Sequence, residues 1–138
     1  MKTKQIFFGG IAGGVTFFIL GYIIYGVLLM NYTTANYNQG AMRPMTEMIW
    51  WAMILANLAF GFILSFVLSW SNTTIVMAGV RLAIILGLLL SLSVDLSNYA
   101  MTTMFSNFGA VLVDIVGFSI MSGVSGAVVI WIMGRIKS

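Results

Sequence analysis

The sequence predicts an all-α membrane protein, a four-transmembrane-helix bundle that occupies residues 1–138 as a single domain. The first observation is composition: 61% of the residues are hydrophobic and 7% are charged, whereas soluble domains carry about 25% charged residues. The second observation is that the apolar residues form four long runs separated by polar segments. Because about 20 apolar residues cross the hydrocarbon core of a bilayer, each run is long enough for one helix.

The first helix is expected at about 6–30, after a basic lead that contains Lys2 and Lys4. A secretory signal peptide has an apolar core of only about 7–15 residues, so we expect this longer run to be retained as a helix. Its first half carries glycines at small-xxx-small spacing, which allows a second helix backbone to approach closely. These residues are Gly9, Gly10, Gly13 and Gly14.

The second helix is expected at about 44–70, after a polar segment, Asn31–Arg43, that is predicted to be the longest loop. Pro44 suits a first helical turn because its missing N–H is not needed there. Glu47 would lie in that same turn, where the helix dipole favours an acid. Asn57 lies near the middle of this helix, and we expect it to turn inward toward another helix.

The third helix is expected at about 75–97, after a short polar turn at 71–74 that predicts antiparallel packing of the second and third helices. Arg81 and Asp95 are fourteen residues apart in it, close to four turns, so they are expected on one face. Arg81 lies near the cytoplasmic edge, where it would extend toward the interface. A functional alternative is that it binds a lipid phosphate or gates a pathway.

The fourth helix is expected at about 108–134, a run in which Asp114 is the one formal charge. An ionised carboxylate that faces lipid costs at least about 2.5–3.5 kcal/mol. Asp114 is therefore expected to face protein or water. A second stripe of small residues follows it on this helix, formed by Ser119, Gly123 and Gly126.

The sequences of the two halves of the chain match loosely, as two repeated helical hairpins would. Gly14-Val15 resembles Gly79-Val80, and the spacing Asn57…Gly61-Phe62 resembles Asp114…Gly117-Phe118. A duplicated hairpin would place a pseudo-two-fold axis along the membrane normal. Chance similarity within apolar sequence is the alternative explanation.

The basic residues predict the orientation of the chain. In a four-helix topology five of them fall on one side, and the positive-inside rule assigns that side to the cytoplasm. They are Lys2, Lys4, Arg81, Arg135 and Lys137. We therefore expect a multi-pass protein of the cell membrane with both termini in the cytoplasm. All three acids fall in the outer half: Glu47, Asp95 and Asp114.

The outer acids form the first candidate site, because Asp95 and Asp114 are predicted at similar depth. Two carboxylates that face each other in a medium of low dielectric do not both ionise readily, so the pair would share a proton. Arg43 would relieve the repulsion, Glu47 would compete for it, and Asn57 is a further polar candidate. We expect a proton- or cation-binding site at an outward vestibule. The alternative is a structural network that fixes helix register.

Methionine supplies the second candidate site. The chain has 11 Met, and thioethers are soft ligands that suit Cu(I). The candidates on the outer side are Met42, Met45, Met48, Met101 and Met104. Met also fills irregular gaps in apolar interfaces, which is the alternative role for these residues.

The absences in the sequence narrow the functional classes. With no Cys and no His, the chain lacks thiolate and imidazole ligands and the usual general base. No Ser nucleophile motif, P-loop, dinucleotide fingerprint or metalloprotease helix is present. We therefore expect no enzymatic activity and no cofactor. The formal net charge of +3 comes from scattered residues, so nucleic acid is not an expected partner.

Two functional classes remain. One is a transporter or channel-like protein for protons, cations or a small solute, which uses the outer acids. The other is a non-catalytic accessory subunit or scaffold that packs against a larger membrane complex through its glycine faces. The small-residue stripes of the first and fourth helices are expected to be exposed, and this favours a homo-oligomer or a larger membrane partner.

Two short motifs carry a family resemblance. They are Leu20-Gly21-Tyr22-Ile23-Ile24-Tyr25 in the first helix and Val113-Asp114-Ile115-Val116-Gly117-Phe118 in the last. The chain resembles small bacterial four-helix integral membrane proteins of a domain-of-unknown-function family. The first helix of that family carries Leu-Gly-x-x-Trp-Tyr, with Ile24 here in place of Trp, and its last helix contains an Asp. The resemblance implies the four-helix architecture and a bacterial inner-membrane location, and it implies no activity.

Overall fold

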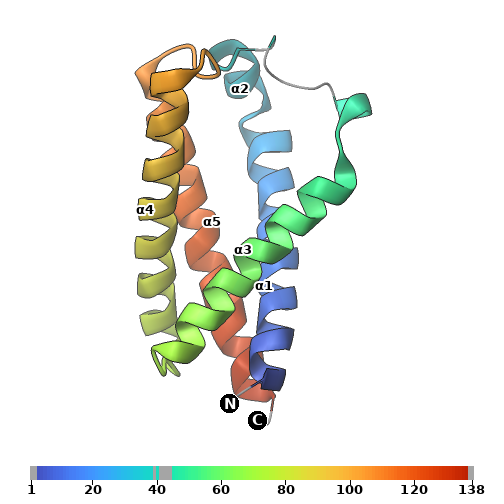
Figure 1. Ribbon diagram of the computed structural model, residues 1–138, viewed down its shortest axis with the longest axis vertical. Helices are drawn as coiled ribbons and strands as arrows, with labels where there is room; N and C mark the ends of the chain where they lie inside the picture. Colours follow the sequence, from blue (N-terminus) through green and yellow to red (C-terminus); the bar gives the residue numbers. More distant parts are fainter. Residues whose placement is uncertain (1–2, 39, 41–44, 137–138) are drawn as a thin grey trace.

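The computed structural model describes residues 3–38, 40 and 45–136, and it confirms the all-α class. Within these ranges, four helical segments are long and apolar enough to cross a membrane. They are Thr3–Leu28, Trp50–Trp70, Val76–Met101 and Phe108–Arg135. Both chain ends lie at the same end of the molecule, which we call the inner end (Figure 1). The opposite end, where α4 connects to α5, is the outer end.

The first spanning segment is not a regular α-helix throughout. Helix α1 covers Thr3–Ile23 and continues into a π-helical turn, η1, at Ile24–Leu28, where the Leu29 N–H donates to the Ile24 carbonyl at 2.7 Å. A short helix, α2, follows at Met30–Asn36. The prediction of a loop over 31–43 is therefore wrong for its first part. Polar side chains there bond back to the backbone, as when Asn36 donates to the Tyr32 carbonyl at 3.0 Å.

The second spanning helix begins later than the sequence predicts. Helix α3 runs from Trp50 to Trp70, and a separate 3₁₀ turn, η3, occupies Met45–Glu47. The chain leaves helical geometry at Ile49, with φ −85° and ψ 89°, so Glu47 is not in the first turn of a spanning helix. Pro44, the predicted start, lies outside the described residues. The turn from α3 to α4 closes with Asn72 at φ 55°, a left-handed conformation that Asn tolerates.

The last two spanning helices are α4, Val76–Met101, and α5, Phe108–Arg135. Helix α4 extends four residues beyond the predicted end at 97. Helix α5 begins where it was predicted, because the Asn107 side chain caps it by accepting from the Ala110 N–H at 2.9 Å.

Helices α4 and α5 pack through small residues in a constant register. Cβ atoms added to Gly79, Gly87 and Gly126 would meet Ile130, Ser122 and Ala83, respectively. The contacts advance by four residues on each helix, antiparallel to one another. Extending this register by two steps pairs Ser91 with Phe118 and then Asp95 with Asp114. The predicted small stripe of the last helix is thus used within the chain, and it is not exposed.

Helix α5 packs on α1 through a second stripe of its own residues. Cβ atoms added to Gly9, Gly13 and Gly21 of α1 would meet Met133, Val129 and Met121 of α5. At the outer end the roles reverse, and a Cβ on Gly117 would meet the Tyr25 hydroxyl. This register is again antiparallel with four-residue steps, so it places Ser125 opposite Phe17. Helix α5 therefore lies between α1 and α4.

Helix α3 crosses α1 diagonally at a glycine contact (Figure 1). A Cβ added to Gly61 would meet the backbone of Gly10 and Gly14, and Ser65 donates to the Ile6 carbonyl at 2.7 Å. The predicted close approach at the glycines of the first helix is confirmed. Because these glycines contact α3 and α5 of the same chain, the expectation that their stripe is exposed is wrong.

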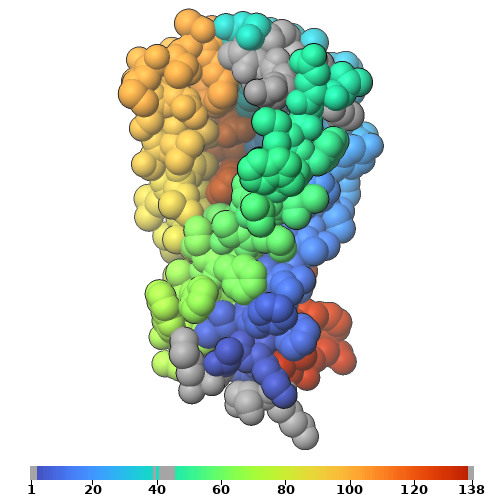
Figure 2. Space-filling model, turned by 45° about the vertical axis from the view of Figure 1, so that its right-hand side comes forward, coloured from blue at the N-terminus to red at the C-terminus, as the bar shows by residue number. Residues whose placement is uncertain are grey.

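Helices α3 and α4 are joined by a short turn but are not packed neighbours along their lengths, in contrast to the prediction. They contact each other only slightly, because the crossing on α1 leads the outer half of α3 away from α4. Figure 2 shows α5 exposed in a hollow between them. The two tight pairs are α1–α3 and α4–α5, which are the two predicted hairpins. The two pairs differ in geometry, because α4 and α5 run side by side whereas α3 crosses α1 diagonally (Figure 1).

The α1–α3 crossing gives a direct test of packing. Gly61→Ala would push a methyl group into the backbone of α1, and overpacking of this kind costs about 1–3 kcal/mol. We expect a lower melting temperature in detergent, measured by size-exclusion chromatography after heating. Gly134→Ala is the matched control because nothing lies within 4 Å of the added Cβ. A melting temperature for Gly61→Ala equal to that of the control would contradict the crossing.

Candidate functional site

Asp95 and Asp114 meet at the outer end of the α4–α5 interface. Each lies six residues from the end of its helix, Met101 or Phe108, which is about 9 Å along the helix axis. The α4–α5 register places the two residues opposite each other, and their carboxyl groups are close enough to interact electrostatically. Asp95 is buried, with 6% of its surface exposed, and Asp114 is half-buried. The structure therefore brings together the two acids that the sequence predicted as a pair.

The outer connections build a cap over this pair. Tyr37 and Phe105 form an isolated antiparallel bridge, and their rings pack edge to face with centroids 5.1 Å apart. The Asn38 N–H donates to the Met104 carbonyl at 2.7 Å, which fixes the segment after α2 on the α4–α5 connection. The Tyr37 hydroxyl donates to Asp114 Oδ1 at 3.0 Å. The connection from α2 thus supplies a hydrogen-bond donor to the acid pair.

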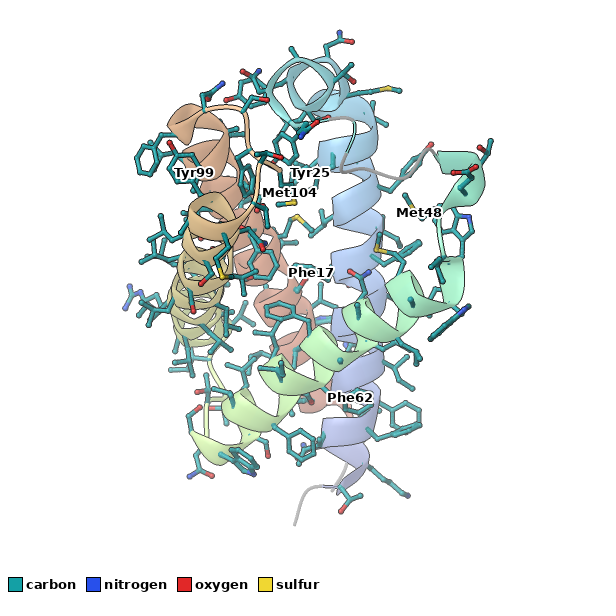
Figure 3. All side chains as sticks on the ribbon, turned by 45° about the horizontal axis from the view of Figure 1, so that its top comes forward. Phe17, Tyr25, Met48, Phe62, Tyr99 and Met104 are labelled. Carbon is teal, nitrogen blue, oxygen red and sulfur yellow. The ribbon has the colours of Figure 1, made fainter. Side chains whose placement is uncertain are left out.

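A second phenol reaches the pair from the π-helical turn. Tyr25 lies in η1, and its hydroxyl donates to the backbone carbonyl of Asp114 in a long hydrogen bond of 3.4 Å. The lack of a side chain on Gly117 makes room for this hydroxyl, because a Cβ there would lie 3.1 Å from it. Isolated π turns are often found at functional sites. Figure 3 shows Tyr25 at the outer end, on the α5 side of α1.

Tyr37 remains a donor over the physiological pH range. Burial, and next the charge of Asp114, raise the pKa of the Tyr37 phenol above its ordinary value. A raised pKa keeps the phenol protonated, and only the protonated phenol can donate to Asp114 Oδ1.

One oxygen of the pair has no hydrogen-bond partner among the described residues. Asp95 Oδ2 is buried and accepts no hydrogen bond there. The described basic residues do not compensate for it, because Lys4 and Arg135 lie at the inner end and Arg81 is exposed on α4. Buried carboxyl oxygens are normally satisfied by a donor or a cation. Among the described residues, Asp95 Oδ2 therefore lacks the donor or cation that such an oxygen normally has.

The other outer candidates do not join the pair among the described residues. Glu47 is exposed in η3, which Figure 1 shows on the far side of α1 from α4. The Asn57 amide donates to the Met53 carbonyl of its own helix at 2.7 Å. Arg43 lies outside the described residues, so the prediction that it neutralises the acids is not tested.

Arg81 lies on a different face from Asp95, in contrast to the prediction. The α4 stripe that packs on α5 begins at Gly79, and Arg81 lies two residues, or about 200° around the helix, from Gly79. The buried stripe of α4 follows four-residue steps and reaches Asp95 but not Arg81, which is exposed. Its predicted role at a lipid phosphate or as a gate remains a prediction.

The methionine candidates are divided between separate places. Figure 3 shows Met104 beside α5 and Met48 on the opposite side of α1, near η3. Met101 is 77% exposed at the end of α4, and Met104 packs against the cluster around Tyr37 and Phe105. Met42 and the side chain of Met45 lie outside the described residues. The described methionines therefore do not form one thioether site.

Sequence reasoning missed the two phenols of the site, Tyr25 and Tyr37. Tyr25 lies in an apolar run where an aromatic residue is ordinary, and Tyr37 lies in a segment that was predicted to be a loop. A usable signal was present, because a membrane acid needs donors and these two residues are near the outer end of the first helix.

Comparison of the chain with protein-family models, with curated proteins and with solved structures gives no significant match. The resemblance to bacterial four-helix proteins therefore stays a prediction, and the functional argument depends on the geometry of the acid pair.

The Tyr37 hydrogen bond can be tested by Tyr37→Phe. Hydrogen bonds to charged groups contribute about 1.5–3 kcal/mol, so the variant is expected to lower the free energy of unfolding by that order. The difference from the native chain should be constant at neutral pH. It should disappear only as the pH rises above the ordinary tyrosine value of about 10, because the folded-state pKa is raised.

The measurement is denaturant unfolding of the detergent-solubilised protein at several pH values. Tyr22→Phe is the control, since Tyr22 is 59% exposed, and a change within about 0.5 kcal/mol is expected for it. If Tyr37→Phe and Tyr22→Phe have the same free energy of unfolding, the Tyr37–Asp114 hydrogen bond does not stabilise the protein.

Proposed function

We propose that this membrane protein binds a proton or a small cation at the Asp95–Asp114 pair and moves it across the bilayer as a transporter or channel-like protein. The observation that carries the proposal is the pair itself, with Asp95 Oδ2 buried and without a partner among the described residues. The four apolar helices support the membrane setting.

Electrostatics favours a bound positive charge. Two like charges about 4 Å apart repel by about 4 kcal/mol at an effective dielectric constant of 20. One hydrogen bond to a charged group returns about 1.5–3 kcal/mol, so the Tyr37 bond does not offset that repulsion. A proton shared by the carboxyl groups, or a cation between them, removes the repulsion and satisfies the free oxygen.

The donor set defines the class of ligand. The atoms around the pair are carboxyl, phenol and backbone carbonyl oxygens. Hard oxygen donors suit protons and alkali or alkaline-earth cations, and they do not suit Cu(I). We therefore favour a proton or a hard cation over the methionine-based alternative.

The accessory-subunit alternative loses its main support. It depended on exposed glycine faces, and those of α1 and α5 are packed against other helices of the same chain. The acid pair also comes from α4 and α5 of one chain, so the proposed site does not require a second copy. A homo-oligomer remains a proposal that needs another interface.

We further propose that the inner end faces the cytoplasm of a bacterial inner membrane. Lys4 and Arg135 lie at that end in the structure, and the positive-inside rule supports this orientation. The acid pair would then receive its proton or cation from the outer side.

The test is flux into proteoliposomes that contain a pH-sensitive dye. A potassium gradient with valinomycin sets an inside-negative potential, and uptake is followed for the native chain, Asp95→Asn and Asp114→Asn. We expect each amide variant to lose about tenfold or more of the flux, because the amide cannot exchange a proton or neutralise a cation. Sodium- and potassium-sensitive dyes identify a cation if the proton signal is absent.

Glu47→Gln is the matched control, since it makes the same acid-to-amide change at an exposed outer acid away from the pair. It should keep the native flux. Melting temperature and elution volume show that each variant is folded. Native flux in a folded Asp114→Asn variant, or an equal loss in Glu47→Gln, would disprove the role of the pair.

A further inference from the structure

Three phenylalanines from three helices meet in the core. Phe17 of α1, Phe60 of α3 and Phe118 of α5 have ring centroids 4.5, 5.0 and 5.1 Å apart in their three pairings. Two of the contacts are edge to face, with interplanar angles of 69° and 66°. Phe17 and Phe60 are buried, and Phe118 is partly buried. We call this set the aromatic cluster.

The cluster lies directly inward of the acid pair. Phe118 follows Asp114 by four residues, one helical turn, in the stripe of α5 that faces α4. A group that moves inward from Asp114 along this stripe therefore meets the Phe118 ring first. Because the ring also contacts α1 and α3, it closes the space between these helices and α5 at that level.

A polar group without a partner lies about two helical turns inward of Phe118 on α5, at the level of Phe17. Ser125 is fully buried, and its Oγ has no hydrogen-bond partner among the described residues. The α1–α5 register places it opposite Phe17, one turn beyond Met121. A buried hydroxyl without a partner is destabilising, so a purely structural account of Ser125 is incomplete.

Further inward, an apolar layer separates Ser125 from a polar pocket. Leu64 and Val129 are fully buried in this layer, and Ser65 beside them bonds to the Ile6 carbonyl. The pocket opens at the inner end with a volume of about 80 Å³, and its polar lining includes Gln5, Ser69, Asn72, Thr73 and Thr74. A cavity of that size and polarity holds a few water molecules.

We propose that the aromatic cluster is the gate of the conduction path, and that Ser125 is the first polar group without a hydrogen-bond partner among the described residues that a proton or cation meets after passing Phe118. This inference rests on the proposed function of the acid pair. Apolar constrictions close such paths by excluding water. In the structure the gate is closed at Phe118, with the acid pair on the outer side of this ring and Ser125 and the inner pocket on its inner side.

Truncation of the gate should create a leak. Phe118→Ala is expected to raise the passive proton permeability of proteoliposomes about tenfold, measured with a trapped pH dye after an external pH step. Phe60→Ala provides a second, independent truncation in case one variant does not fold. Phe118→Leu keeps an apolar side chain at the constriction and is expected to stay closed.

Two controls test whether the leak is specific to the aromatic cluster and passes through the acid pair. Phe66→Ala makes the same truncation on α3 but beside Trp70, where the ring centroids are 5.4 Å apart and away from the cluster, and it should not leak. The double variant with Phe118→Ala and Asp114→Asn should return to the native permeability, because the leak is expected to pass through the acid pair.

Ser125→Ala separates a conduction role from a structural one. Removing a buried hydroxyl that has no partner should leave the melting temperature unchanged or raise it. The same variant should lower the leak of the Phe118→Ala background severalfold. A structural role for Ser125 would instead lower the melting temperature and leave the leak unchanged.

The outcomes are distinct. A leak in Phe118→Ala that Asp114→Asn abolishes supports the gate, whereas folded Phe118→Ala and Phe60→Ala variants without a leak overturn it. A leak that persists in the double variant also overturns it, because it is then a nonspecific opening. Failure of the proposed function appears separately, as native flux that does not depend on Asp114 in the chain with an intact cluster.

Discussion

The close packing of α5 on α4 is the constraint on which the rest of the structure depends. The small residues Gly79, Ala83 and Gly87 recur every four residues on α4, and they let the α5 backbone approach closely. This close approach fixes the register of the two helices. Small side chains have this effect in membranes because van der Waals packing, and not the hydrophobic effect, drives helix association there. The same register that seats Ser122 against Gly87 carries Asp95 to Asp114. The position of the acid pair thus depends on glycines of α4 that lie about two and four turns from Asp95.

Helix α5 occupies the centre because it carries two such stripes. One stripe faces α4 and the other faces α1, and the aromatic cluster forms where α3 crosses over α1 and reaches α5. On α5, Phe118 of the aromatic cluster follows Asp114 of the acid pair by about one turn, and Ser125 follows Phe118 by about two turns. A single rigid helix therefore sets the order of the proposed path from the outer end to the inner pocket.

The sequence predicted the parts of this architecture that composition and period determine. Four apolar runs of sufficient length define four spanning helices, and the isolated charge of Asp114 in such a run requires a polar neighbour. The glycines of α1 predict a close crossing by another helix, but they do not identify that helix. The partner is α3 at Gly61, and this could not be predicted because every helix of the chain offers small residues.

The rest depended on backbone geometry that has no periodic signal. The residue composition at the π turn, Ile24–Leu28, and at helix α2 is equally typical of the end of a helix and of a loop. Tyr37 reaches Asp114 only because the segment after α2 bonds to the Met104 carbonyl, a contact between residues 66 positions apart. Arg81 illustrates the same limit from the other direction, since the four-residue steps of the α4–α5 interface, and not a count of nearly whole turns, decide which residues of α4 face α5.

The widened turn of η1 holds one residue more than an α-helical turn would, as the bond from the Leu29 N–H to the Ile24 carbonyl shows. Loss of a single residue from this turn would restore ordinary helical bonding and rotate everything that follows by about 100° around the axis. Helix α2 and the phenol of Tyr37 would then swing away from α5, while the first spanning segment would be shorter by only one residue. A one-residue deletion that leaves the hydropathy profile almost unchanged would therefore remove a hydrogen-bond donor from the acid pair.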